Sequence, residues 1–370
     1  MTIGLLNPTV LMRRPIAELA SVLQSRGHEV TILTPATAQR HWAPSHYESA
    51  SIRVVELPSV EIRRVLWSLP SWTAIKRLWA AVREYDVLQI WAPYYLVAVL
   101  PIIFAKLRRS PTKVIVTLDT IPGFSFRFDS IIDPLMVWYH RLICSWLFRL
   151  VDARTLYSAQ LLPFARQAWL GSKFTILPTG IHPPEFRPRT RIADAPAALL
   201  FIGIINARKG VAVLLQAMAI LGVAGRSYTL TIVGDGPERQ QMEELARQLG
   251  LQDTVTFVGR SSQIETYYTA ADVLILPSYG EGLPGVVMEA MAYGVPVVAT
   301  DIPCLTELIP DGHHGQLVPL GRADAVASGI IRYLDDEPYR QSVIRSARRR
   351  IESFSWSAVV PRYETLYDAA

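Results

Sequence analysis

The sequence predicts an α/β protein of two domains, each with a parallel, doubly wound sheet. Apolar runs of five or six residues recur along the chain and helical stretches separate them, which is the order that parallel strands and crossover helices require. The 370 residues are 50% hydrophobic, enough for two cores of ordinary size. Residues 177–191 contain four prolines and mark the joint, because proline continues neither kind of element.

The first domain, residues 1–180, is expected to begin with a strand, a helix and a strand. Arg26 and Gly27 close that helix, as a basic last turn followed by glycine should. Residues 87–105 carry no formal charge, which approaches the ~20 apolar residues that a bilayer requires. Their glutamine and prolines instead favour a buried strand, a loop and an apolar helix. The expected strands are 2–8, 29–35, 86–91 and 113–119, and the first helix is 15–28.

The second domain, residues 181–352, repeats this alternation. In open parallel sheets, ligands bind beyond the carboxyl ends of the strands. Two such domains would form a cleft if the loops of both pointed into it. The expected strands are 198–205, 228–237, 254–259, 272–278 and 295–301, and the expected helices are 210–221, 238–250 and 285–294.

The charge is unevenly distributed. Residues 1–180 hold 20 Lys+Arg against 11 Asp+Glu, a net +9, and residues 181–370 hold 17 against 21, a net −4. A basic half indicates an anionic partner, either nucleic acid or a membrane face. The basic residues of 61–83 lie among tryptophans and leucines, without the arginine/glycine tracts or zinc ligands of nucleic-acid modules. We therefore expect membrane-surface contact and no nucleic-acid partner.

The two cysteines, Cys144 and Cys304, lie far apart in apolar settings. They indicate neither a disulfide framework nor a metal cluster, so a reducing cytoplasm is expected. The first residues lack the basic and then apolar layout of a signal peptide.

The stretch SYGEGLPGVVMEAMAYGVPVVATD, residues 278–301, carries the strongest functional signal. It predicts a glycine-loosened turn and a helix start, whose free N–H groups and positive dipole end suit an anion. Glu281 and Glu289 are carboxylates, which accept hydrogen bonds from hydroxyl groups. A nucleotide-sugar has both a diphosphate and many hydroxyls, so it would fit. The alternative is that Glu281 is only an N-terminal charge and Glu289 a solvated helix residue.

Two further loops are expected at the same edge of this sheet. GIINARKG, residues 203–210, supplies Arg208 and Lys209 as cations for a diphosphate, although both could be solvated loop residues. GDGP supplies Gly234. No glycine–x–glycine–x–x–glycine follows the first strand, so a dehydrogenase lacks its expected signal.

From about Leu199 to Val318 the chain resembles the retaining glycosyltransferases of family 4, whose GT-B fold has two facing Rossmann-like domains. The glutamates seven residues apart, the lysine loop and GDGP carry the resemblance. It implies no cofactor and no metal ion, retention of anomeric configuration, an acceptor on the first domain, and a return helix at 353–370. In the donor site it implies that Glu281 binds hydroxyls of the sugar and Glu289 binds hydroxyls of the ribose. Lys209 would bind the diphosphate together with the N–H groups of Gly282 and Leu283. Arg260 would lie beside the base.

Three departures from the family pattern stand out. Ile204 occupies a position where the family usually has a second phosphate-binding arginine, a role that Arg208 could take over. NPTVLMRRP replaces a glycine-rich loop after the first strand. Asp119 replaces the histidine of the family's first domain. It could accept a proton or hold a hydroxyl, or it could cap the following turn.

The basic, tryptophan-rich stretches 63–79 and 136–150 fit a membrane-borne acceptor, although the second could be a buried helix. The expected protein is a cytoplasmic, retaining hexosyltransferase on the inner face of the cell membrane. It would transfer a sugar from a nucleotide-diphosphate-sugar to a lipid-linked or glycan acceptor, with Glu281, Lys209 and Asp119 as catalytic residues. The alternatives are a nucleotide-sugar epimerase and a degenerate nucleotide-sugar-binding module.

Overall fold

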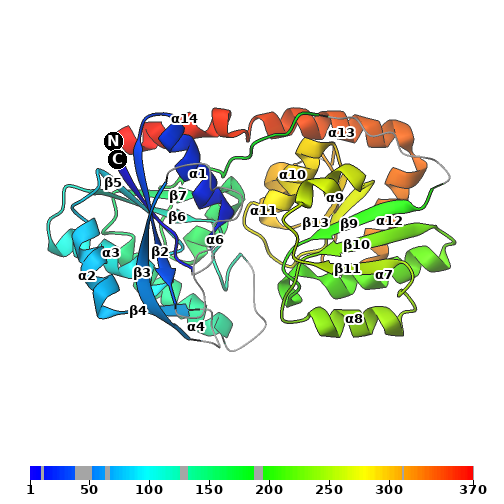
Figure 1. Ribbon diagram of the computed structural model, residues 1–370, viewed down its shortest axis with the longest axis horizontal. Helices are drawn as coiled ribbons and strands as arrows, with labels where there is room; N and C mark the ends of the chain where they lie inside the picture. Colours follow the sequence, from blue (N-terminus) through cyan, green and yellow to red (C-terminus); the bar gives the residue numbers. More distant parts are fainter. Residues whose placement is uncertain are drawn as a thin grey trace. The chain divides into compact units, whose positions relative to one another are not determined.

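The computed structural model describes residues 1–9, 12–37, 52–62, 67–125, 132–186, 195–310 and 312–369. They form two compact units, Met1–Gly180 together with Trp356–Ala370, and Ile181–Ser355. Each unit has one sheet with helices packed against it (Figure 1), which confirms the α/β class. Parts of four predicted segments lie outside the described residues: 10–11 after the first strand, 63–66 in the first basic stretch, 187–191 in the joint, and 311 in the second domain.

The first unit is built on a sheet that has eight strands within the described residues, in the order β4-β3-β2-β1-β5-β6-β7-β8. Its central strands are buried on both faces, which explains their nearly continuous apolar sequences. The strands are β1 (Thr2–Leu6), β2 (Glu29–Ala36), β3 (Arg53–Ile62), β4 (Trp67–Pro70), β5 (Val87–Trp91), β6 (Lys113–Leu118), β7 (Ala153–Leu156) and β8 (Thr175–Ile176).

One edge of this sheet departs from the predicted parallel pattern. Strand β4 pairs antiparallel with β3, from Ser59 opposite Pro70 to Ile62 opposite Trp67. Only four residues separate the two strands in the sequence, and a parallel connection needs a crossover of a dozen residues or more. The short connection therefore requires the antiparallel pairing.

The predicted strand, loop and apolar helix at 87–105 are confirmed as β5 and α3. Among the described helices, none combines the length and the apolar character that crossing a bilayer requires. The helices of the first unit are α1 (Arg14–Ser25), α2 (Trp72–Ala81), α3 (Leu96–Leu107), α4 (Ile132–Tyr139), the π-helix η1 (His140–Cys144), α5 (Ser145–Leu147), the 3₁₀ turn η2 (Ala159–Leu161), α6 (Leu162–Gln167) and α14 (Trp356–Ala369).

Helix α14, at the end of the chain, completes the first unit by packing beside α1 (Figure 1). Trp356 is buried, and its indole N–H donates to the Glu18 carboxylate of α1 at 2.9 Å. The indole ring covers Gly180 so closely that a Cβ built at that glycine would lie 2.4 Å from it. The middle of α14 is held as well, because the Tyr363 hydroxyl donates to the Pro178 carbonyl at 3.2 Å.

The second unit has a parallel sheet of six strands within the described residues, in the order β11-β10-β9-β12-β13-β14. Its strands are β9 (Ala197–Ile202), β10 (Tyr228–Val233), β11 (Val255–Gly259), β12 (Val273–Leu276), β13 (Val297–Thr300) and β14 (Gln316–Val318). Its helices are η3 (Ala207–Lys209), α7 (Val211–Val223), α8 (Arg239–Gln248), α9 (Ile264–Ala270), α10 (Gly285–Tyr293), α11 (Pro303–Leu308), α12 (Ala323–Asp335) and α13 (Glu337–Glu352).

Both sheets reverse their strand order once. In the first unit, β2 and β5 flank β1; in the second, β10 and β12 flank β9. At such a reversal, the loops after two neighbouring strands run to opposite faces of the sheet and leave a crevice beyond the strand ends. The loops after β9 and β12 carry Lys209 and Glu281, and the loop after β1 carries Arg13.

We expect Gly180→Ala to destabilise the first unit by about 1–3 kcal/mol, because the new methyl group overlaps the buried indole of Trp356. Urea unfolding should show a lower midpoint. Gly222→Ala in α7 is the matched control, because its Cβ would find no atom closer than 3.9 Å. That helical substitution should leave the midpoint unchanged or raise it. A wild-type midpoint for Gly180→Ala would contradict the tight packing.

Candidate functional site

The central contact of the second unit is an ion pair between its two switch-point loops. The Lys209 ammonium group donates to Oε1 of Glu281 at 2.6 Å, and both side chains are buried, with 11% and 6% of their surfaces exposed. The loop reaches this position because Gly210 has φ +65°, and a Cβ there would lie 2.1 Å from the Pro277 carbonyl oxygen. Only glycine permits both the conformation and the close approach.

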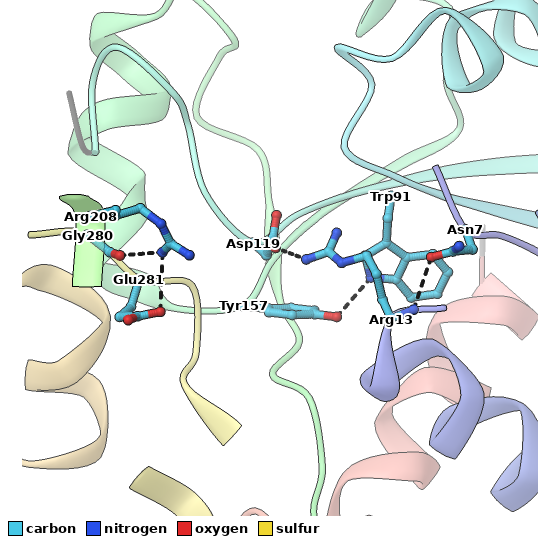
Figure 2. A network of polar contacts seen from close by, with 8 residues as sticks. All are labelled: Asn7, Arg13, Trp91, Asp119, Tyr157, Arg208, Gly280 and Glu281. Atoms are coloured by element: carbon cyan, nitrogen blue, oxygen red, sulfur yellow. Dashed lines mark hydrogen bonds and ion pairs between the residues drawn. The ribbon is translucent and has the colours of Figure 1, made fainter. Parts of the chain in front are cut away.

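Arg208 completes the pairing of Glu281. Its guanidinium donates to the Gly280 carbonyl and lies 3.3 Å from the other oxygen of Glu281, Oε2 (Figure 2). Burial by itself would raise the pKa of Glu281, but Lys209 and then Arg208 outweigh it and hold that pKa below its usual value. Glu281 is therefore ionised at neutral pH and accepts hydrogen bonds on both oxygens.

Helix α10 follows this loop as predicted. It begins after Pro284 and ends at Gly294, which has φ +73°. Among the described residues, no acceptor takes the backbone N–H of Gly282 or Leu283. Two N–H groups and the positive end of the helix dipole thus lie beside the Glu281–Lys209 pair, an arrangement that suits an anion.

Glu289 differs from its prediction. It was expected to flank an apolar stripe on α10 and to point toward the cleft, whereas the structure buries it. Its Oε2 accepts from the Tyr268 hydroxyl of α9 at 2.6 Å, and the Tyr268 ring stacks on Tyr293 with centroids 5.2 Å apart. The predicted apolar stripe was too narrow, because Met288, which it did not include, is buried as well. Helix α10 is therefore covered over most of its circumference.

The other predicted donor-site residues lie on neighbouring loops. Gly234 follows β10 with φ +143°, and a Cβ there would lie 1.9 Å from the Gly203 carbonyl oxygen, so its glycine is required by the packing of two loops. Arg260 is exposed directly after β11. Ile204 is exposed after β9. Arg208, which was expected to replace the arginine missing at position 204, precedes Lys209 and also contacts Glu281.

Asp119 lies in the first unit, at the end of β6, and its partner was not predicted. Nη2 of Arg13, in the loop after β1, donates to Oδ2 of Asp119 (Figure 2). The Arg13 N–H also donates to Oδ1 of Asn7 at 3.3 Å. The sequence offered one signal, a pair of arginines in the loop after the first strand, where a switch-point loop was due. The structure gives Asp119 this ion pair in place of the turn cap considered as an alternative.

Within the described ranges, the chain brings together no group of three or more His, Cys, Asp or Glu residues that could hold a metal ion.

Comparison with known families covers nearly the whole chain. Residues 12–184 match the family described as Glycosyltransferase Family 4, and residues 183–350 match the family described as Glycosyl transferases group 1. The chain belongs to the family-4 glycosyltransferases. Its two Rossmann-like units are those of the GT-B fold, so the predicted family and fold are confirmed.

Relatives and solved structures agree with this assignment. The glycosyltransferase is 28% identical over 362 residues to a phosphatidyl-myo-inositol mannosyltransferase of Mycolicibacterium smegmatis, covering 95% of this chain and 88% of that protein. It is 36% identical over 185 residues to an alpha-D-kanosaminyltransferase of Streptomyces kanamyceticus, about half of each chain. In structure it resembles HepE of Anabaena in complex with UDP and glucose, with a TM-score of 0.80, 17% identity and full coverage of both chains.

Removing the main cation of the buried pair should destabilise the glycosyltransferase in a pH-dependent way. We expect Lys209→Met to cost about 3–5 kcal/mol near neutral pH, because it leaves the Glu281 carboxylate buried beside Arg208 alone. In the wild type the lowered pKa of Glu281 gives stability that is present above the pKa of the unfolded chain and lost as pH falls through the folded pKa. In the variant that pKa should rise, so the deficit should shrink toward pH ~4.

Urea unfolding at neutral and acidic pH measures both effects. Lys173→Met is the matched control, since Lys173 is exposed in the first unit, and its midpoint should follow the wild type at every pH. A Lys209→Met deficit that stayed constant with pH would show that it does not arise from the charge of Glu281.

Proposed function

We propose that this glycosyltransferase is a retaining, metal-independent enzyme that moves a hexose-type sugar from a nucleotide-diphosphate-sugar to a lipid-linked or glycan acceptor. The observation that carries the proposal is the Lys209–Glu281 contact at the crevice where the second sheet reverses its strand order. It places a cation, an ionised carboxylate and free backbone N–H groups together, the three groups that a diphosphate attached to a sugar requires.

In the proposed donor complex, the charges divide between the two parts of the donor. Lys209 and the N–H groups of Gly282 and Leu283 bind the diphosphate, and Glu281 accepts hydrogen bonds from the sugar hydroxyls. Arg208 and Lys209 keep Glu281 ionised, so it can accept but cannot donate. We assign the ribose to Glu289, which requires the Tyr268 hydroxyl to share or release its hydrogen bond, and we assign the base to Arg260.

In the proposed reaction, the bond from the anomeric carbon to the diphosphate oxygen breaks and a bond to the acceptor oxygen forms on the same face. The acceptor proton passes to the departing phosphate. Negative charge develops on the leaving diphosphate, and a fixed ammonium and oriented N–H groups stabilise such charge most where water is excluded. They would also supply the positive charge that a divalent ion supplies elsewhere, so we propose that no metal is required.

The acceptor class follows from the relatives. The mycobacterial relative, which matches 95% of this chain, is by its name a phosphatidyl-myo-inositol mannosyltransferase, and the HepE structure contains UDP and glucose. We propose a hexose donor of this kind and an acceptor with a lipid-linked polyhydroxyl headgroup.

Membrane contact is supported by the helical segment α4–η1–α5 of the first unit. Leu135, Trp138, Leu142 and Trp146 are exposed at spacings of three and four residues and therefore share one face; the two tryptophans expose 56% and 50% of their surfaces. Met136, His140, Cys144 and Leu147 form the buried face. One face of 136–150 is therefore buried, as one of the two predicted alternatives required, and the exposed face is the one on which the proposed membrane contact rests.

The basic residues of this segment suit an anionic bilayer. Arg149 is exposed near Trp146 in the sequence, and the Arg141 guanidinium lies 5.1 Å from the centre of the exposed Trp169 ring. Tryptophan favours the membrane interface, and arginine near anionic headgroups contributes about 1 kcal/mol. We propose that this face lies in the headgroup region of the cytoplasmic leaflet.

The donor site predicts a kinetic defect. Glu281→Gln should lower the transfer rate by about 10²–10³-fold, because it removes the charge that accepts the sugar hydroxyls. A thermal-shift screen with UDP, GDP, ADP and their sugars identifies the donor first, since a ligand that binds the folded state raises its melting temperature with concentration. Transfer is then followed by chromatography with phosphatidylinositol vesicles, with and without EDTA.

Glu265→Gln is the matched control, because Glu265 is an exposed residue in the first turn of α9, and it should transfer at the wild-type rate. Wild-type turnover by Glu281→Gln would refute the site. Loss of activity in EDTA would refute metal independence. Conversion of the donor without any acceptor would support an epimerase, and donor binding without any turnover would support a binding module.

The exposed tryptophans predict a partition defect. Trp138→Ser and Trp146→Ser should each weaken binding to phosphatidylglycerol-containing vesicles by about tenfold, since each removes a large apolar side chain from the interface. Co-sedimentation measures the partition. Val223→Ser, at an exposed apolar position of the second unit, is the control and should bind as the wild type does. Equal binding by all variants would contradict this face as the contact.

A further inference from the structure

The Arg13–Asp119 pair has the features of a ligand site in its own right. Its two members come from loops after β1 and β6, 106 residues apart in the sequence, at the carboxyl edge of the first sheet. The Arg13 side chain is 27% exposed and that of Asp119 11%. The arginine is therefore the more accessible member, and the carboxylate is fixed behind it.

Only one oxygen of Asp119 is engaged. Oδ2 accepts from Arg13, whereas Oδ1 is buried and, among the described residues, meets no donor within hydrogen-bond distance. A buried acceptor without a donor costs about 1–3 kcal/mol, and such a group in a native structure calls for an explanation. The arrangement is accounted for if a hydroxyl group of a ligand donates to Oδ1.

Three tyrosines lie near enough to the pair to interact with its charges. Tyr94 and Tyr95 are half-buried with ring centroids 5.1 Å apart, and Tyr157 is buried and accepts from the Trp91 indole at 2.8 Å. Arg13 and Asp119 both act electrostatically on all three tyrosines. Burial first, and then the charge of Asp119, raises the pKa of Tyr94 well above its usual value, so its hydroxyl keeps its proton.

The charges indicate the class of ligand. Asp119 offsets the charge of Arg13, and the pair is neutral overall, which disfavours a phosphate as the main ligand. A guanidinium and a carboxylate side by side instead match two neighbouring hydroxyl groups of a ring. The oxygen of one hydroxyl accepts a hydrogen bond from the arginine, and the other hydroxyl donates one to the aspartate. Tyrosine rings suit the C–H faces of such a ring.

We propose that the Arg13–Asp119 pair binds the polyhydroxylated ring of the acceptor, with Arg13 orienting Asp119 so that Oδ1 accepts a hydrogen bond from a ring hydroxyl. The inference rests on the proposed function and adds to it the residues that bind the acceptor ring, Arg13 and Asp119 with the tyrosines near them. Arg13 touches the acceptor and positions Asp119, and no covalent step is assigned to either residue.

The test is acceptor kinetics with phosphatidylinositol vesicles and the donor found in the thermal-shift screen. Arg13→Gln and Asp119→Asn should each raise the KM for phosphatidylinositol about 10–100-fold, the loss of a charged hydrogen bond, and change kcat much less. The double variant should be no worse than either single one, because the two residues act as a unit. Arg13→Lys should recover part of the loss.

Arg14→Gln is the matched control, since Arg14 adjoins Arg13 but pairs with Glu18 of its own helix at 2.8 Å, and it should keep the wild-type KM. The donor-induced thermal shift should be the same in all variants, which also shows that they fold. An Arg13→Gln variant with the wild-type KM, or additive losses in the double variant, would overturn this inference alone. Wild-type protein that binds donor but transfers nothing to phosphatidylinositol would overturn the acceptor class, and with it both proposals.

Discussion

The single reversal of strand order in each sheet determines where chemistry can occur in this glycosyltransferase. In the second unit, β9 and β12 are neighbours although 70 residues separate the end of one from the start of the other. Their loops leave toward opposite faces, so Lys209 and Glu281 meet beyond the strand ends with backbone N–H groups beside them. The glycine at 210 makes this meeting possible, because any side chain there would collide with the Pro277 carbonyl.

The two units differ in the net charge of the groups at the carboxyl edge of their sheets. In the second, two cations surround one carboxylate, so a positive charge remains for an anion. In the first, one cation meets one carboxylate among tyrosine rings, and no net charge remains. A diphosphate suits the positive site of the second unit, and a neutral polyol suits the neutral pair of the first unit. The proposed division of donor and acceptor between the units is thus consistent with their charges.

The fold and the positions of the loops that carry Lys209 and Glu281 could be predicted from the sequence because their signals are local. Glu281 and Lys209 could be assigned to loops because each follows an apolar run and precedes a helix. Arg13 could not, because its partner lies far along the chain and only the fold brings the two together. The burial of Glu289 was also missed, since a helix covered on most sides has no clear apolar stripe. Edge strand β4 was missed because its four residues carry too little pattern.

The return of α14 to the first unit has a consequence for how the chain acquires its structure during synthesis. The second unit is continuous, and all of its residues have been translated once Ser355 has been added. The first unit begins earlier but lacks Trp356 and the rest of α14 until the codons after that of Ser355 have been read. Domains generally form from the amino terminus onward as the ribosome proceeds. Here the order is inverted for the final step, and the unit that emerges first is the last to be completed.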